Sequence, residues 1–66
     1  MLRGDLKVIA QRIAHKSRVL DLGCGDGSLI RWLEAEKQCT CYGVEISPDK
    51  VLQCMEKKVN VIQADI

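Results

Sequence analysis

Residues 18–27 read RVLDLGCGDG, a short apolar run (Arg18–Leu22) followed at once by alternating glycines (Gly23–Gly27). The run is β-prone and almost continuously apolar, which is typical of a parallel strand covered on both faces. Glycine at alternate positions permits the backbone angles of a sharp strand-to-helix turn, and it leaves room for a ligand beside the main chain. The segment therefore predicts a strand, a glycine turn and then a helix.

On both sides of this segment, helical and strand patterns alternate. Apolar residues recur every three or four positions over 2–14, as in an amphipathic helix. A second helix is predicted over 28–37, and a third begins at Ser47, where Ser, Pro and an acid follow one another as in a helix cap. The expected buried stripe of the third helix is Val51, Leu52 and Met55. Two further strands are predicted over 40–46 and 59–64.

The resulting α-β-α-β-α-β order predicts an α/β protein with a parallel sheet, the N-terminal portion of a Rossmann-like three-layer sandwich. Three parallel strands make half of a doubly wound fold, and such a half leaves an edge and much of one sheet face uncovered. We therefore expect residues 1–66 to be the N-terminal part of one domain of a longer protein. We also expect this chain alone to bind a cofactor weakly or not at all.

Composition argues against several kinds of partner. Ten Lys and Arg residues balance nine Asp and Glu residues, and only Trp32 and Tyr42 are aromatic, so nothing indicates a nucleic-acid partner. The longest uncharged run, Gln38–Val44, is far shorter than the roughly 20 residues that span a bilayer. The N-terminus also lacks the continuous apolar region of a signal peptide. We expect a cytoplasmic protein with no membrane partner.

The four cysteines are predicted to be reduced and buried. They lie at positions 24, 39, 41 and 54, where a small apolar residue would serve, and no export signal accompanies them. Zinc sites need four ligands, usually in short-spaced pairs, whereas the only close pair here is C-x-C and the only histidine is His15. No metal site is therefore expected.

Acidic residues follow the ends of all three predicted strands. In a parallel sheet, ligands bind beyond the carboxyl ends of the strands, so these acids and the glycine turn are expected to form one site. The predicted cofactor-binding residues are, in chain order, Asp21, Gly23, Cys24, Gly25, Asp26, Gly27, Glu45, Ile46, Asp65 and Ile66.

Two of these acids have specific expected roles and plain alternatives. Glu45 lies about 20 positions beyond Gly23, the separation at which a dinucleotide fold places its ribose-binding acid. Its carboxylate can accept hydrogen bonds from both ribose hydroxyls, but it could instead pair with a lysine such as Lys50. Asp65 could accept a hydrogen bond from the adenine amino group, or it could lie in a solvated terminus.

Charge and spacing favour S-adenosylmethionine over other nucleotides. The NAD fingerprint needs glycine or alanine where this chain has Ser28, and Asp21 and Asp26 would repel a pyrophosphate. No GK[ST] follows the glycines, so ATP bound by a P-loop is excluded. S-adenosylmethionine carries a positively charged sulfonium and ammonium, and both are favoured beside acidic side chains. The N-terminus of the second helix would remain available for its carboxylate.

The quoted segments also resemble a known family. Val19–Gly27 resembles the first motif of class I S-adenosylmethionine-dependent methyltransferases. More narrowly, RGDLKVIAQRI, SRVLDLGCGDGSLIRWL and YGVEIS, the last followed by a helix and VNVIQADI, resemble the MetW methionine-biosynthesis family over nearly the whole chain. The resemblance implies a Rossmann-like methyltransferase fold. It further implies support of homoserine acylation in methionine synthesis, with a homoserine O-acyltransferase as partner.

The same resemblance implies roles for individual residues. Asp21, Gly23 and Gly25 would frame the methionyl part of S-adenosylmethionine, Glu45 would hold the ribose and Asp65 the adenine. The turn that follows Glu45 is less acidic than the family pattern, which leaves the ribose to Glu45 alone.

Two alternative functions remain open from the sequence. One is the NAD-binding half-domain of an oxidoreductase, and the other is a non-catalytic module that binds a partner enzyme. No residue is an evident general base, because His15 precedes the first strand and so belongs to the opposite end of the sheet. We therefore name no catalytic residue.

Overall fold

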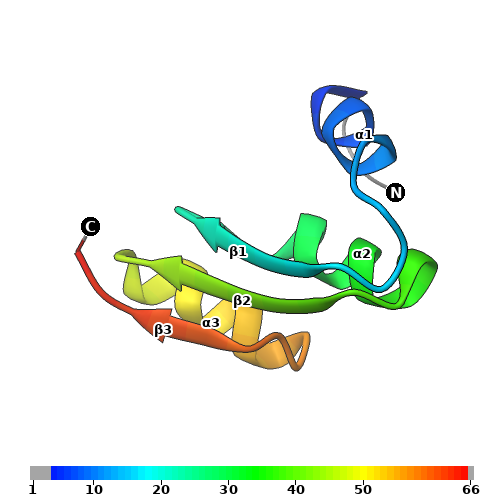
Figure 1. Cartoon of the computed structure of the whole chain (residues 1–66). Helices are drawn as coiled ribbons and strands as arrows, with labels where there is room; N and C mark the ends of the chain where they lie inside the picture. The colour runs from blue at the N-terminus through cyan, green and yellow to red at the C-terminus, as the bar shows by residue number, and fades with distance from the viewer. Residues whose placement is uncertain (1–3, 66) are drawn as a thin grey trace.

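The structure is a computed structural model that describes residues 4–65. Its elements, in chain order, are α1 (Gly4–Gln11), β1 (Arg18–Leu22), α2 (Ser28–Lys37), β2 (Thr40–Glu45), α3 (Pro48–Glu56) and β3 (Val61–Gln63). Figure 1 shows the three strands side by side with their arrowheads at the same end. The predicted α-β-α-β-α-β order is confirmed, and only the ends of some elements differ.

The three strands form one parallel sheet in the order β1-β2-β3. β1 pairs with β2 in a register that places Leu20 opposite Tyr42, and β2 pairs with β3 so that Val44 lies opposite Ile62. Because the strands are parallel, their carboxyl ends meet at one edge of the sheet. The glycine turn, Glu45 and the residues after β3 are therefore brought to that edge, as the sequence predicted.

One face of the sheet carries the helices and the core. α2 and α3 pack against the strands there, and α1 packs against α2. The buried apolar residues are Ala10, Cys24, Ile30, Leu33, Cys39, Cys41, Cys54 and Val59. All four cysteines are free thiols in buried positions, which confirms the prediction for them.

The opposite face of the sheet is apolar and uncovered within residues 4–65. Leu20, Leu22, Tyr42 and Ile62 are each more than half exposed there. The sequence had indicated cover on both faces of the first strand, whereas the described helices cover only one. The Rossmann-like architecture is thus present with one of its two helical layers, and this agrees with the expected incomplete sheet.

The buried stripe of α3 differs from the predicted one. Leu52 and Met55 are 57% and 62% exposed, whereas Cys54 is fully buried. The reason is that α3 turns Cys54 toward the glycine turn, where its Sγ lies 3.2 Å from the carbonyl oxygen of Gly25. The more hydrophobic side chains consequently face outward.

The first helix ends earlier than predicted, and a lysine satisfies carbonyl groups at and just beyond its end. The ammonium of Lys37, at the end of α2, donates to the carbonyl oxygens of Ala10 at 2.8 Å, Gln11 at 3.2 Å and Ile13 at 2.6 Å. These contacts fix the C-terminal end of α1 to α2. Residues 1–3, which the predicted helix also included in part, lie outside the described residues.

The packing beneath the glycine turn gives a stability prediction. A Cβ at Gly43 would lie 2.5 Å from Cys24 Sγ and 3.0 Å from Ile30 Cδ1, whereas a Cβ at Gly4 would meet no atom within 4 Å. We expect Gly43→Ala to lower the free energy of unfolding by about 1–3 kcal/mol through overpacking. Gly4→Ala should not lower it. Urea unfolding followed by circular dichroism measures both, and equal stability of the two variants would contradict the packing described.

Candidate cofactor site

The glycine turn after β1 uses backbone angles that favour glycine. Gly23, Gly25 and Gly27 have φ angles of 73°, 60° and 83°, all in the left-handed region. At Gly27 space is also short, because a Cβ would lie 3.0 Å from Cys54 Sγ. The alternating glycines thus allow the chain to leave the strand, turn beside α3 and enter α2.

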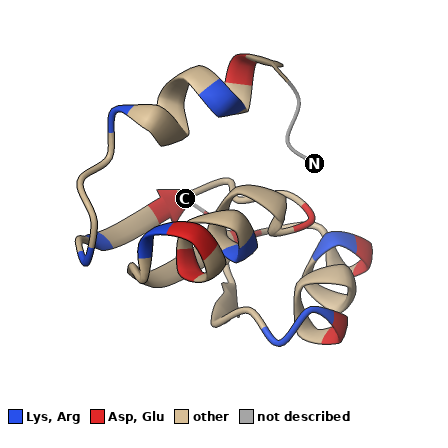
Figure 2. Cartoon of the chain, turned by 90° about the vertical axis from the view of Figure 1, so that its right-hand side faces the viewer, with Lys and Arg blue, Asp and Glu red and all other residues tan. Residues whose placement is uncertain are grey.

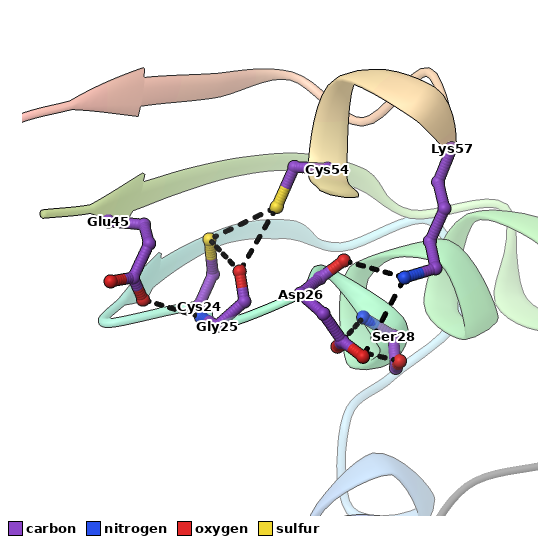
Figure 3. Close-up of polar contacts among 7 residues, drawn as sticks. All are labelled: Cys24, Gly25, Asp26, Ser28, Glu45, Cys54 and Lys57. Atoms are coloured by element: carbon purple, nitrogen blue, oxygen red, sulfur yellow. Dashed lines mark hydrogen bonds and ion pairs between the residues drawn. The ribbon is translucent and has the colours of Figure 1, made fainter. Parts of the chain in front are cut away.

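The carboxylate of Glu45 joins the ends of β1 and β2. Its Oε1 accepts a hydrogen bond from the Gly25 N–H at 2.8 Å, and its Oε2 accepts one from the Ser47 N–H at 2.9 Å. Figure 3 shows the side chain pointing into the glycine turn. The Ser47 and Gly25 N–H groups together hold the pKa of Glu45 below its usual value. Glu45 is therefore an anion at neutral pH although only 9% exposed.

The alternative for Glu45, an ion pair with Lys50, is not what holds this side chain. Both carboxylate oxygens of Glu45 accept backbone N–H groups, and the lysine that pairs with a carboxylate at the glycine turn is Lys57, which pairs with Asp26. Lys50 contributes only a longer-range attraction that helps to lower the pKa of Glu45. By its lone pairs, each carboxylate oxygen can accept a second hydrogen bond.

Asp26 caps the start of α2. Its Oδ1 accepts hydrogen bonds from the Ser28 hydroxyl at 2.7 Å and the Ser28 N–H at 3.0 Å, and these two contacts hold the pKa of Asp26 below its usual value. The sequence had left this end of the helix open to the carboxylate of a ligand. In the structure a carboxylate of the chain itself occupies the first N–H, where an external anion would otherwise bind.

A cavity of about 480 Å³ lies beside the glycine turn. Its lining includes residues 23–26, Asp21, Leu6 and Ile9 of α1, and Lys50 of α3. Burial raises the pKa of Asp21 above its usual value. The cavity therefore combines carboxylates and open backbone on one side with apolar side chains of α1 on the other.

The cysteines beside the cavity act as buried thiols. Cys24 Sγ and Cys54 Sγ lie 3.9 Å apart, and both lie near the carbonyl oxygen of Gly25. Burial first, and then the hydrogen bond with Cys54, raise the pKa of Cys24 to about 12. Cys24 is consequently protonated at neutral pH and is unsuited to nucleophilic chemistry.

The structure brings most of the predicted site residues together. Asp21 and residues 23–26 line the cavity, and Glu45 contacts the turn directly through Gly25. Ile46 is 56% exposed next to Glu45, and Asp65 is exposed at the same edge of the sheet beyond β3. Ile66 lies outside the described residues.

The sequence analysis missed the residues that approach the turn from the helices. Leu6 and Ile9 belong to the periodic apolar residues of the first helix, and the structure places both in the cavity lining, with Ile9 51% exposed. Their three-residue spacing placed them on one face of a helix but did not show what that face contacts. The position of Lys57 near the C-terminal end of the third helix also gives no sign that its ammonium contacts Asp26.

Charges elsewhere are mixed, and no metal centre is formed by the described part of the chain. Figure 2 shows basic and acidic segments interspersed along the helices. No group of three or more metal-ligating side chains comes together among residues 4–65. Over the same residues, no helix has the length and apolarity needed to cross a membrane.

Solved structures with this arrangement define the class of fold. YJHP from E. coli is 20% identical over 98% of this chain and 31% of its own, with a TM-score of 0.81. An S-adenosylmethionine-dependent methyltransferase from Thiobacillus denitrificans, in complex with S-adenosyl-L-homocysteine, is 21% identical over 98% of this chain and 30% of its own, with a TM-score of 0.82. TrmK of M. capricolum, bound to S-adenosylhomocysteine, is 16% identical over 98% of this chain and 33% of its own, with a TM-score of 0.88. The fold is that of class I S-adenosylmethionine-dependent methyltransferases.

The family model narrows this class further. Residues 3–66 match the model described as methionine biosynthesis protein MetW, and the chain belongs to this family. No curated protein sequence matches the chain significantly. The chain spans about a third of the length of the solved structures named above.

The lowered pKa of Glu45 gives a pH-dependent prediction. Because the folded state favours the charged carboxylate, Glu45 contributes stability above its unfolded pKa of 4.5 and loses that contribution as the pH falls through the lower folded value. We expect Glu45→Gln to lower the urea midpoint at pH 7, and the difference from wild type to shrink toward pH 3. Glu36→Gln, which removes an exposed carboxylate, is the control. A constant difference across this pH range would contradict the assignment.

Proposed function

We propose that this chain is the S-adenosylmethionine-binding part of a methyltransferase-like protein. The observation that carries the proposal is the Glu45 carboxylate, which is ionised and bonded to the glycine turn at the carboxyl edge of the sheet. The same edge holds a cavity with Asp21 in its lining. Family membership and the fold of the solved structures support the same function.

The donor and acceptor groups at this edge suit an adenosyl sulfonium compound. Glu45 has accepting capacity left on both oxygens for the two ribose hydroxyls. Asp21 would supply negative charge toward the sulfonium and ammonium. Gly23 and Gly25, which line the same cavity and carry no side chains, would let the ligand approach the main chain. Asp65 would serve the adenine, beside Ile46 and Ile66.

When bound, S-adenosylmethionine supplies an electrophilic methyl group on its sulfonium. The residues of this chain would bind and orient the cofactor, and holding the methyl group in line with an acceptor can supply much of the rate gain. The side chains of α1 in the cavity lining would help to exclude water from that space. Nothing among the described residues identifies a base or the methyl acceptor.

The capped end of α2 disfavours the NAD-binding alternative. A dinucleotide fold places the pyrophosphate on the N-terminus of this helix. Here the Asp26 carboxylate accepts the Ser28 N–H at that position, so a pyrophosphate would have to displace it. Lys57 lies 3.6 Å from Asp26 Oδ2 and partly balances that charge. Asp21 is then the main negative charge in the cavity lining, which also contains Lys50.

For the whole protein we propose a role in methionine biosynthesis, in support of homoserine O-acylation with a homoserine O-acyltransferase as partner. This part rests on membership of the MetW family and on the family resemblance. Co-purification of the acyltransferase with the protein, under conditions that retain weak complexes, tests it. Co-purification without measurable methyl transfer would favour a non-catalytic partner-binding module.

Cofactor choice is tested by titrating the chain with S-adenosylhomocysteine and, separately, with NADH. We expect saturable binding of S-adenosylhomocysteine, weaker than micromolar because one sheet face and the β1 edge lack neighbours among residues 4–65. Calorimetry or amide chemical shifts provide the readout. Tighter binding of NADH would overturn the proposal, and sub-micromolar affinity would contradict the expected weakness.

Asp21 is predicted to lower the stability of the folded chain at neutral pH and to favour binding of the cationic cofactor. Its raised pKa means that the folded state favours the protonated form, so its contribution to stability is present below the unfolded pKa and is lost as the pH rises through the folded value. At neutral pH we expect Asp21→Asn to unfold at a higher urea concentration. The variant should also bind the cationic S-adenosylmethionine less well relative to neutral S-adenosylhomocysteine. An unchanged affinity ratio would exclude Asp21 from the site.

A further inference from the structure

The carbonyl groups of the glycine turn are held by side chains from the far end of α3. The thiol of Cys54 donates to the Gly25 carbonyl oxygen at 3.2 Å, and the ammonium of Lys57 donates to the Asp26 carbonyl oxygen at 3.0 Å. Figure 3 shows both side chains descending from α3 onto the turn. Two successive peptide groups of the turn are therefore anchored on the same side.

Anchoring these carbonyls sets the direction of the N–H groups. In a trans peptide the C=O and N–H point in opposite directions, and no cis peptide occurs among the described residues. The Asp26 N–H therefore points away from α3, toward the side of the turn on which Figure 3 draws α1. Among residues 4–65 this N–H has no acceptor, and Gly25 and Asp26 both line the cavity.

The other anchored peptide closes the turn. The Gly27 N–H donates to the Cys24 carbonyl oxygen at 3.2 Å, on the side opposite the Lys57 contact. Lys57 also lies 3.6 Å from Asp26 Oδ2, so one ammonium contacts both the main chain and the carboxylate of Asp26. With side chains 36% and 43% exposed, the ion pair alone would contribute little. The carbonyl contact is the feature that constrains the backbone.

We infer that Lys57 is a positioning residue for cofactor binding. By holding the Asp26 carbonyl toward α3, Lys57 keeps the next peptide in place, with the Gly27 N–H on the Cys24 carbonyl oxygen. It thereby fixes the turn in the form in which the Cys54 contact directs the Asp26 N–H into the cavity, as a donor for an oxygen acceptor of the ligand. This inference rests on the proposed function for its effect on affinity. Its effect on the backbone of the turn stands on the contacts of the chain alone.

Lys58 supplies a matched control. It is the next residue, carries the same charge, is exposed, and makes no side-chain hydrogen bond or ion pair within the described part of the chain. Lys58→Met therefore removes one positive charge from the same region without removing the contact to Asp26. Lys57→Arg keeps a charged donor at position 57 and tests whether the contact can be restored.

The experiment compares amide spectra and S-adenosylhomocysteine titrations of wild type, Lys57→Met, Lys57→Arg and Lys58→Met. Without ligand, Lys57→Met should shift the amide signals of Asp26 and Gly27, and Lys58→Met should leave them in place. With ligand, Lys57→Met should weaken binding about 3- to 10-fold, the loss expected for one hydrogen bond. Lys57→Arg should recover most of that loss.

The outcomes separate this inference from the proposed function. Equal spectra and equal affinities for Lys57→Met and Lys58→Met would overturn the positioning role while leaving cofactor binding intact. If wild type binds NADH more tightly than S-adenosylhomocysteine, the proposed function fails. The ligand-free amide shifts then still decide whether Lys57 orients the turn. If Lys57→Met unfolds, the amide signals of the whole chain lose their dispersion. In that event Lys57→Arg is compared with wild type by the same two measurements, the ligand-free amide shifts and the S-adenosylhomocysteine titration.

Discussion

The site depends on one buried carboxylate that holds two backbone segments together. Glu45 accepts the N–H of Gly25 in the glycine turn with one oxygen and the N–H of Ser47, before α3, with the other. A carboxylate that replaces its water shell with backbone N–H groups remains charged in a position with little solvent access. The end of β2 thereby fixes the turn that follows β1 and the start of α3 at the same time.

Other contacts complete a turn whose two sides differ. Toward α3, the carbonyl oxygens of Gly25 and Asp26 accept hydrogen bonds from Cys54 and Lys57. On its other side, the turn borders the cavity, which is lined by Asp21, by apolar side chains of α1 and by Lys50 from the start of α3. The turn can thus present the Asp26 N–H and the negative charge of Asp21 to a ligand, because the carbonyl groups of Gly25 and Asp26 are already satisfied by α3 and Lys57. α1, held through Lys37, supplies the remaining wall.

The sequence predicted the fold well because its signals are local. The period of the apolar residues, the glycines after Leu22 and the Ser-Pro start of α3 each specify structure within a few residues, and the parallel order then brings Glu45 to the turn. What it could not predict were contacts between distant helices. The choice of Cys54 rather than Leu52 as the buried residue of α3 depends on the space beside Gly27. The contact of Lys57 with Asp26 joins residues that are 31 positions apart in the chain. Apolar spacing alone does not contain that information.

The central claim is that an ionised Glu45 holds the glycine turn through the Gly25 N–H. Its most direct test is a pH titration by NMR that follows the side-chain carboxyl carbon of Glu45 and the amide of Gly25 together. The account predicts a pKa below the ordinary 4.5 for Glu45, and a Gly25 amide signal that moves with the same midpoint. A pKa at or above 4.5, or a Gly25 amide that does not respond to the protonation of Glu45, would contradict it.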